Sequence, residues 1–213
     1  MKKIMFWMIL IGSILAILGS CAKDENEAAS STTSSCATDT TASGSITVGS
    51  ETMSGVYLTQ CVDISSNAGQ QIFPSDTKSG KKVVVVTGDA DISEEFLIYT
   101  DTACSTPSLT WKQGRTNFTV GSASGSNYAV TYKDATVKVK PFTDVAKSAM
   151  DSFATSSNNS VTFTVGTETT VNSSGNTKYN LFYVTSSAIK TGDADDNATP
   201  SSLDNIELTK SCE

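Results

Sequence analysis

The segment Thr136-Val137-Lys138-Val139-Lys140 alternates apolar and polar side chains residue by residue. In an extended strand successive side chains point to opposite faces, so this alternation indicates one apolar face and one solvated face. Val161-Thr162-Phe163-Thr164-Val165 has the same pattern. Strands of this kind are typical of antiparallel sheets that cover a core on one side. The pattern predicts an all-β domain.

Short runs of β-branched and aromatic residues, separated by Gly, Ser, Asn and Asp, continue on both sides of this segment, and we interpret them as strands. Val83 to Val86 is a continuous apolar run and is predicted to be covered on both faces. Lys133-Asp134-Ala135 and Asn172 to Asn176 are each predicted to be hairpin connections. The expected strands are 45–48, 55–64, 82–87, 96–100, 109–111, 116–120, 127–132, 136–140, 161–165, 178–185 and 206–209.

A helix is expected at 143–154. Thr143 follows Pro141 and can cap the helix, and Val145, Ala149 and Phe153 recur at helical spacing. About ten short strands with one helix predict an antiparallel up-and-down barrel, closed or nearly closed. A two-sheet β-sandwich is the alternative.

The N-terminus has a different character. Lys2 and Lys3 precede an apolar run from Ile4 to Ile17, and Leu18-Gly19-Ser20-Cys21 follows. This order resembles the lipobox signal peptide of bacterial lipoproteins. The run is shorter than the roughly 20 apolar residues of a permanent membrane span, which would be the alternative. The resemblance implies removal of residues 1–20 by cleavage between Ser20 and Cys21, and lipidation of Cys21.

Lipidation of Cys21 implies a diacylglyceryl thioether on its sulfur and, in many bacteria, a further acyl chain such as palmitate on its amine. Each buried methylene contributes about 0.8 kcal/mol, so several chains anchor a protein nearly permanently. The membrane is thus an expected partner, and the bacterial cell envelope the expected location. Ala22 favours the outer membrane, because in enteric bacteria an Asp at that place signals retention in the inner membrane.

Composition separates a tether from a domain. Residues 21–45 carry the lipidated cysteine and are dominated by Ser, Thr and Ala, which bury too little apolar surface to fold, so we expect a flexible tether. Residues 46–213 are expected to form a single β domain.

Several functional classes are excluded by what the sequence lacks. There is no histidine, which removes Ser-His-Asp triads, histidine-ligated zinc and imidazole proton transfer. Arg115 is the only arginine, so no arginine cluster can form. Loss of Lys2 and Lys3 leaves 13 basic residues against 22 acidic ones, a balance that repels nucleic acid. We expect no nucleic-acid partner, no cofactor and no catalytic set.

With Cys21 lipidated, an even number of cysteines remains in an oxidising compartment, which predicts two disulfides and leaves three connectivities open. We favour Cys61–Cys104, which would tie neighbouring hairpins, with Cys36–Cys212 clamping the two ends of the domain.

Acidic side chains supply two further hypotheses. Asp193, Asp195, Asn197 and Asp204 resemble the oxygen ligands of a calcium loop, although Ala198 stands where such a loop needs Gly. General acid and base catalysis could draw on carboxylates, but no spacing marks a pair as catalytic. The carboxylates considered are Asp89, Asp91, Glu94, Glu95 and Asp101.

Gly55-Val56-Tyr57 at the start of an early strand is similar to the Gly-x-Trp signature of lipocalins, with Tyr in place of Trp. The resemblance implies a lipocalin-like barrel, a cysteine near the C-terminus, and a basic side chain, Arg115 or Lys210, over the aromatic ring. The expected helix precedes further strands, whereas lipocalins carry theirs after the barrel.

These observations lead to an expected non-enzymatic lipoprotein of the cell envelope that binds a small apolar ligand in its barrel or an envelope protein on its surface. One alternative is a structural or surface-interaction lipoprotein with a filled barrel. Another is a carboxylate-based hydrolase, which would need two carboxylates facing one cleft.

Overall fold

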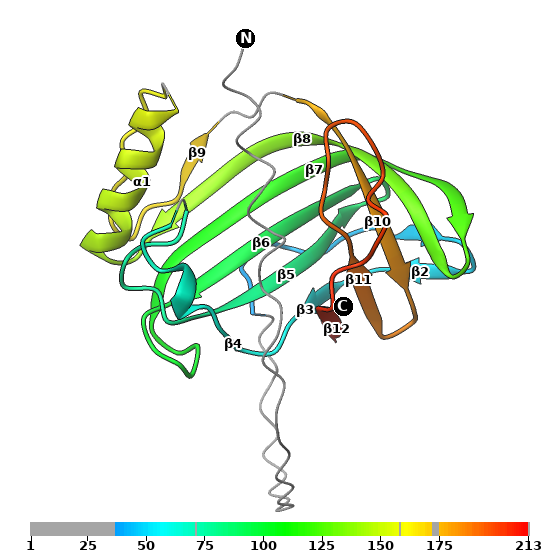
Figure 1. The fold of residues 1–213 in the computed structure, drawn as a ribbon, viewed down its shortest axis with the longest axis horizontal. Coiled ribbons are helices and arrows are strands. Elements are labelled where there is room, and N and C mark those ends of the chain that lie inside the picture. The colour runs from blue at the N-terminus through cyan, green and yellow to red at the C-terminus, as the bar shows by residue number, and fades with distance from the viewer. Residues whose placement is uncertain (1–36, 71, 158, 172–174, 213) are drawn as a thin grey trace, which may run out of the picture.

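The computed structural model describes residues 37–70, 72–157, 159–171 and 175–212. Over these ranges the chain forms mainly strands, with a short 3-10 helix at Ser65–Asn67 and the helix α1, Asp144–Ser156 (Figure 1). The strands are β1 (Ile46–Val48), β2 (Glu51–Met53), β3 (Val56–Leu58), β4 (Val62–Asp63), β5 (Ser79–Gly88), β6 (Asp91–Tyr99), β7 (Pro107–Ser124), β8 (Asn127–Pro141), β9 (Thr169–Val171), β10 (Thr177–Val184), β11 (Ala188–Thr191) and β12 (Glu207–Cys212).

Eight of the described strands close into an antiparallel barrel. Their order is β3-β5-β6-β7-β8-β10-β11-β12, and β12 pairs back onto β3. Neighbours in the barrel therefore follow one another along the chain, which is the up-and-down arrangement. Beyond the closed ring, β4 pairs with β5 and β9 pairs with β8. The predicted up-and-down barrel is confirmed over the sandwich alternative.

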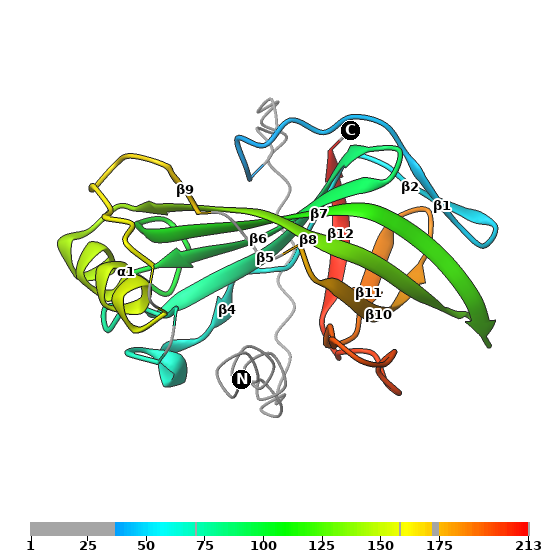
Figure 2. The same cartoon turned by 90° about the horizontal axis from the view of Figure 1, so that it is seen from above.

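The long strands β5 to β8 cross the molecule, with α1 near one end and the short strands β3, β10, β11 and β12 closing the barrel near the other (Figure 1). The view from above shows the same separation of α1 from β10, β11 and β12 (Figure 2). Along β5 the side chains alternate between the two faces. Val84 and Val86 pack in the barrel interior, whereas Val83 and Val85 pack in a separate outer cluster. All four are fully buried, which confirms the predicted coverage on both faces.

Residues 37–45 lie on the outer face of the barrel and are called the N-terminal strap. The backbone N–H of Ser43 donates to the carbonyl of Val86 at 2.9 Å. The hydroxyl of Thr38 donates to Glu95 Oε2 at 2.6 Å. The strap thus attaches the described start of the chain to the sheet and covers the outer apolar cluster, with which Ala37 and Ala42 pack.

The β1–β2 hairpin packs into the interior apolar cluster. Ile46, Val48 and Met53 are buried there with side chains from the barrel strands. The turn between β1 and β2 contains Gly49, and a side chain at this position would collide with the phenol of Tyr128. The hairpin can lie this close to Tyr128 only because Gly49 has no Cβ.

A third apolar cluster lies between α1 and the long sheet. Thr143 caps the helix, with its Oγ1 accepting from Ala146 N at 3.0 Å, as predicted. The buried face of the helix is formed by Ala146, Met150 and Ala154. Of the predicted face, Ala149 and Phe153 are partly buried against the same cluster, and only Val145, which is 41% exposed, lies outside it.

The hairpin predicted at Lys133-Asp134-Ala135 does not exist. β8 runs without a turn from Asn127 to Pro141, and β7 is its equally continuous partner. The pairing register shifts near Asp134, where a bulge re-aims a side chain without reversing the chain. The reversal occurs instead at Gly125, whose φ of 65° suits a glycine turn.

Residues 161–165, predicted as a strand from their alternation, do not form one. Phe163 is buried under α1, and its backbone N–H donates to Asp151 Oδ1 at 3.0 Å. Contact with the helix replaces ladder pairing. β9 and β10 both pair with β8 and not with each other, and residues 172–174 of the connection predicted there lie outside the described residues.

Candidate functional site

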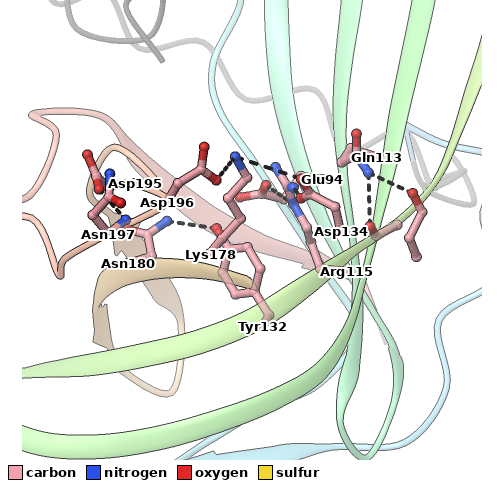
Figure 3. A network of polar contacts seen from close by, with 12 residues as sticks. Glu94, Gln113, Arg115, Tyr132, Asp134, Lys178, Asn180, Asp195, Asp196 and Asn197 are labelled. Atoms are coloured by element: carbon pink, nitrogen blue, oxygen red, sulfur yellow. Dashed lines mark hydrogen bonds and ion pairs between the residues drawn. The ribbon is translucent and has the colours of Figure 1, made fainter. Parts of the chain in front are cut away.

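A row of charged side chains crosses the barrel interior beside the apolar cluster (Figure 3). We call this row the ionic layer. It contains three acids and two bases, contributed by β6, β7, β8, β10 and the segment after β11. Its members are Glu94, Arg115, Asp134, Lys178 and Asp196.

Strand register directs these side chains inward. Glu94 lies opposite Val84, an interior residue, and therefore shares its face of the sheet. Arg115 lies opposite Asp134 on β8. Lys178 lies opposite Tyr132, which is also interior. In an open sheet, charged side chains on one face would be expected to face solvent. Here the sheet closes into a barrel, so this face lines the interior.

The ionic layer is a chain of alternating charge. Arg115 Nε donates to Glu94 Oε2 at 2.8 Å, and its Nη1 donates to Asp134 Oδ1. Lys178 Nζ lies 3.8 Å from Asp134 Oδ2 and 2.5 Å from Asp196 Oδ1. Each base is thus held between two acids, an arrangement that compensates the cost of burying charge.

The ionisation of the central pair is fixed by this geometry. Burial alone would raise the pKa of Glu94, but the positive charges of Arg115 and Lys82 outweigh it, and the pKa is lowered. Burial disfavours the Arg115 guanidinium, but the charge of Glu94 prevails and the pKa of Arg115 is raised. Both groups therefore stay charged at neutral pH.

Aromatic rings fill the space beside the ionic layer. The Arg115 guanidinium carbon lies 5.1 Å from the centroid of Tyr132. The Tyr132 hydroxyl accepts from Asn180 Nδ2 at 3.0 Å, and burial raises its pKa. Phe118 lies between Tyr132 and Phe182, with centroids 5.9 and 5.3 Å away. The interior at this level is occupied by protein side chains.

The four calcium candidates separate into two pairs. Asp195 Oδ1 accepts from the backbone of Asn197 at 2.6 Å and from that of Ala198 at 3.1 Å, which forms a local turn. Burial and the nearby charge of Asp193 raise the pKa of Asp204 to about 6, against the lowering effect of Lys82. Within the described ranges, no group of three or more Cys, Asp or Glu side chains is arranged to hold a metal ion.

The five carboxylates considered for catalysis are dispersed. Glu94 is the member that lines the barrel interior, and its neighbour Glu95 points to the outer face, where it accepts from Ser93 and Thr38. Asp89 accepts from Ser45 N at 3.1 Å. Asp91 begins β6, and Asp101 accepts from the backbone of residues 103, 105 and 106. Hydrogen bonds within that loop lower the pKa of Asp101.

The predicted disulfide between Cys61 and Cys104 is present, with Cα atoms 5.9 Å apart. Cys104 lies in the loop that Asp101 organises, and the bridge ties this loop to the segment between β3 and β4. Cys212 is also disulfide-bonded. Its predicted partner, Cys36, lies outside the described residues, as does the predicted lipidation site Cys21.

The lipocalin-like aromatic, Tyr57, is fully buried in the interior cluster. Of the two basic side chains expected over it, Arg115 instead stacks on Tyr132. Lys210 is the residue opposite Tyr57 in the β12–β3 register, and its Nζ donates to Ser54 Oγ at 3.1 Å. The eight-stranded antiparallel barrel is consistent with the resemblance, while α1 lies between β8 and β9 and not after the barrel.

A half-open hollow of about 390 Å³ lies on the outer face, between the strap and the loop after β6. Its lining includes Leu97, Tyr99, Phe142, Lys112 and Lys140. Lys112 is held by Asp39 and by Glu168 at 3.0 Å, while Lys140 Nζ lies 5.1 Å from the ring centroid of Phe142. The hollow is thus outside the barrel, and its lining combines the two lysines with Asp39.

No protein-family model matches the chain, and comparison with curated proteins finds no match. Among the described residues, no helix has the length and apolar character needed to cross a bilayer.

Sequence reasoning missed most of the ionic layer. It singled out Arg115 as the only arginine and Glu94 as an available carboxylate, without joining them. The sequence predicted no role for Lys178 or Asp196, and it predicted Asp134 to lie in a turn. The one available signal was position: Lys178 and Asn180 occupy alternate places on the strand that carries Phe182 and Val184 on the same face.

Proposed function

We propose that the protein is a lipid-anchored, non-enzymatic protein of the bacterial cell envelope whose barrel is a filled scaffold for surface contacts with other envelope components. The observation that carries this proposal is the occupied interior. The apolar cluster and the ionic layer fill the volume in which a lipocalin-like carrier would hold its ligand. Among the alternatives drawn from the sequence, the filled barrel is the one that this packing supports best.

The envelope location rests on the N-terminal sequence. The lipobox-like stretch Leu18 to Cys21 supports lipidation at Cys21, and Ala22 supports the outer membrane. The Cys61–Cys104 bridge agrees with an oxidising compartment. A scaffold of this kind would be held at the membrane by its lipid and would present the outer face of the barrel, including the hollow beside the strap.

A carboxylate-based hydrolase is not favoured by the geometry. Glu94 is ion-paired to Arg115 in the packed interior, and the other carboxylates considered lie on the outer face or in loops. General acid catalysis needs a carboxyl within reach of a bound substrate, and none of these five is seen to face a partner carboxylate across a cleft.

The anchor is tested by metabolic labelling of the precursor with palmitate in a bacterial host. The wild-type protein is expected to carry label and to fractionate with membranes, and Cys21→Ala is expected to lose both. Cys61→Ala is the matched control, because it removes a cysteine that we assign to a disulfide, and it should keep the label. Palmitate retained by Cys21→Ala would overturn the proposed anchor.

A further inference from the structure

The hollow on the outer face has a fixed shape, because both of its walls are tied to the sheet. One wall is the start of the strap, where Thr38 donates to Glu95 and Asp39 accepts from Lys112. The other wall is the loop after β6, which is held by the disulfide of Cys104. The volume of about 390 Å³ lies within the range of small-molecule sites, and walls that are already ordered lower the cost of binding.

The floor of the hollow is the outer face of β6, β7 and β8. Leu97, Thr110 and Lys140 lie side by side across these strands, since Thr110 is opposite Leu97 on one neighbour and opposite Lys140 on the other. Leu97 belongs to the outer apolar cluster, which places all three residues on the outer face. Tyr99 and Phe142 also line the hollow. The floor therefore combines an apolar surface with a lysine.

The two lysines of the lining differ in their partners. Lys112 is held between Asp39 and Glu168, so its charge is compensated within the protein. Lys140 forms no ion pair with a carboxylate in the described part of the chain, and its Nζ lies 5.1 Å from the ring centroid of Phe142. An ammonium group has three donors, so Lys140 can bind an anion while it stays near the ring.

The other charges near the hollow are also engaged. Glu168 pairs with Lys138 at 3.3 Å as well as with the lysine of β7. Glu95 is fully buried under the strap, where two hydroxyl groups donate to it, and it does not belong to the lining. Lys140 is therefore the charged group that the lining offers to a ligand.

We propose that the hollow binds a small carboxylate with an apolar body, whose carboxylate lies at Lys140 and whose body covers Leu97, Tyr99 and Phe142. A charge-assisted hydrogen bond and the burial of apolar surface would both stabilise such a complex. Aliphatic and aromatic bodies share this chemistry, and the experiment below separates them. The site goes beyond the scaffold function and does not depend on it, because the hollow lies outside the filled interior.

Methyl NMR of the full mature protein measures binding through Leu97, whose side chain lies on the floor of the hollow. The probes are hexanoate and phenylacetate, each compared with its neutral amide at neutral pH. For the preferred carboxylate we expect saturable shifts of the Leu97 methyl groups with a Kd below about 1 mM, and about tenfold weaker binding of its amide. The carboxylate with the lower Kd identifies the body as aliphatic or aromatic.

Two variants locate the ligand. Lys140→Met keeps an apolar stem and removes the charge, so affinity for the carboxylate should fall about tenfold while affinity for the amide is kept. Thr110→Phe places a ring at the centre of the floor, at a strand position that suits an aromatic residue, and should abolish binding. Lys133→Met is the matched control, because Lys133 is an exposed lysine on the same strand outside the lining, and it should bind as wild type.

Four results would each overturn the proposal. The first is the absence of a saturable shift of Leu97 with about 10 mM of either carboxylate. Equal affinity for a carboxylate and its amide would show that the charge is not recognised. An unchanged Kd for the carboxylate in Lys140→Met would exclude this lysine as the binding group. Unchanged binding to Thr110→Phe would place the ligand elsewhere on the protein.

Discussion

Replacement of Arg115 by Met is expected to lower the free energy of unfolding by about 3 to 5 kcal/mol. Arg115 lies between Glu94 and Asp134 in the barrel interior, and Met fills a similar volume without charge. The loss does not come from packing but from the two carboxylates, which stay buried without their shared counter-charge. Urea denaturation followed by the fluorescence of Trp111, which lies on the same strand, measures the change.

Two variants separate charge from shape. Arg115→Lys keeps the charge but loses the fork that reaches both acids, so it should be intermediate. Glu94→Gln combined with Arg115→Met removes one of the two buried carboxylates that lack a counter-charge in Arg115→Met. The double variant should therefore recover part of the stability lost by Arg115→Met alone. If Arg115→Met unfolds within about 1 kcal/mol of the wild type, the ionic layer is not the buried network described above.

Removal of the Cys61–Cys104 bridge is the second large effect. The two cysteines are 43 residues apart, and in the chain-entropy model a loop of this size contributes about 4 kcal/mol to stability. Cys61→Ala with Cys104→Ala is therefore expected to lower the unfolding free energy by about that amount, measured by urea denaturation under oxidising conditions that keep the Cys212 bridge.

Cys104→Ala alone provides the matched comparison for this prediction. It opens the same loop and leaves a free thiol at Cys61, so it should lose as much stability as the double variant if loop closure is the source. A loss below about 1 kcal/mol in both variants would contradict this explanation and would mean that the loop closed by the bridge is already restrained in the unfolded chain.

The barrel could be predicted because its strands carry strong local signals. Val137 and Val139 are buried in the cluster between α1 and the sheet, whereas Lys138 and Lys140 are more exposed, as the alternation requires. The Thr143 cap of α1 could also be predicted from the sequence. The burial of Ala146 in place of Val145 could not be predicted, because the two residues are adjacent and only the docking of α1 on the sheet decides which of them is buried.

The ionic layer was hidden for a related reason. A charged residue in a strand is normally assigned to the solvated face. Lys178 and Arg115 violate that rule because the segment after β11 brings Asp196 to Lys178 and the neighbouring strand β6 brings Glu94 to Arg115. The bulge at Asp134 has the same origin: Lys133-Asp134-Ala135 has the composition of a turn, yet tertiary pairing with Arg115 keeps the strand continuous.

The central claim is that the barrel is filled, and methyl NMR of the mature protein during titration with a long-chain fatty acid tests it most directly. Val84, Val86 and Ile189 place buried side chains in the interior, and Leu97 and Leu109 line the outer hollow. The account predicts that the three interior residues keep their chemical shifts throughout. Saturable shifts of Val84, Val86 and Ile189 with one equivalent of fatty acid would contradict it and would establish the barrel as a carrier.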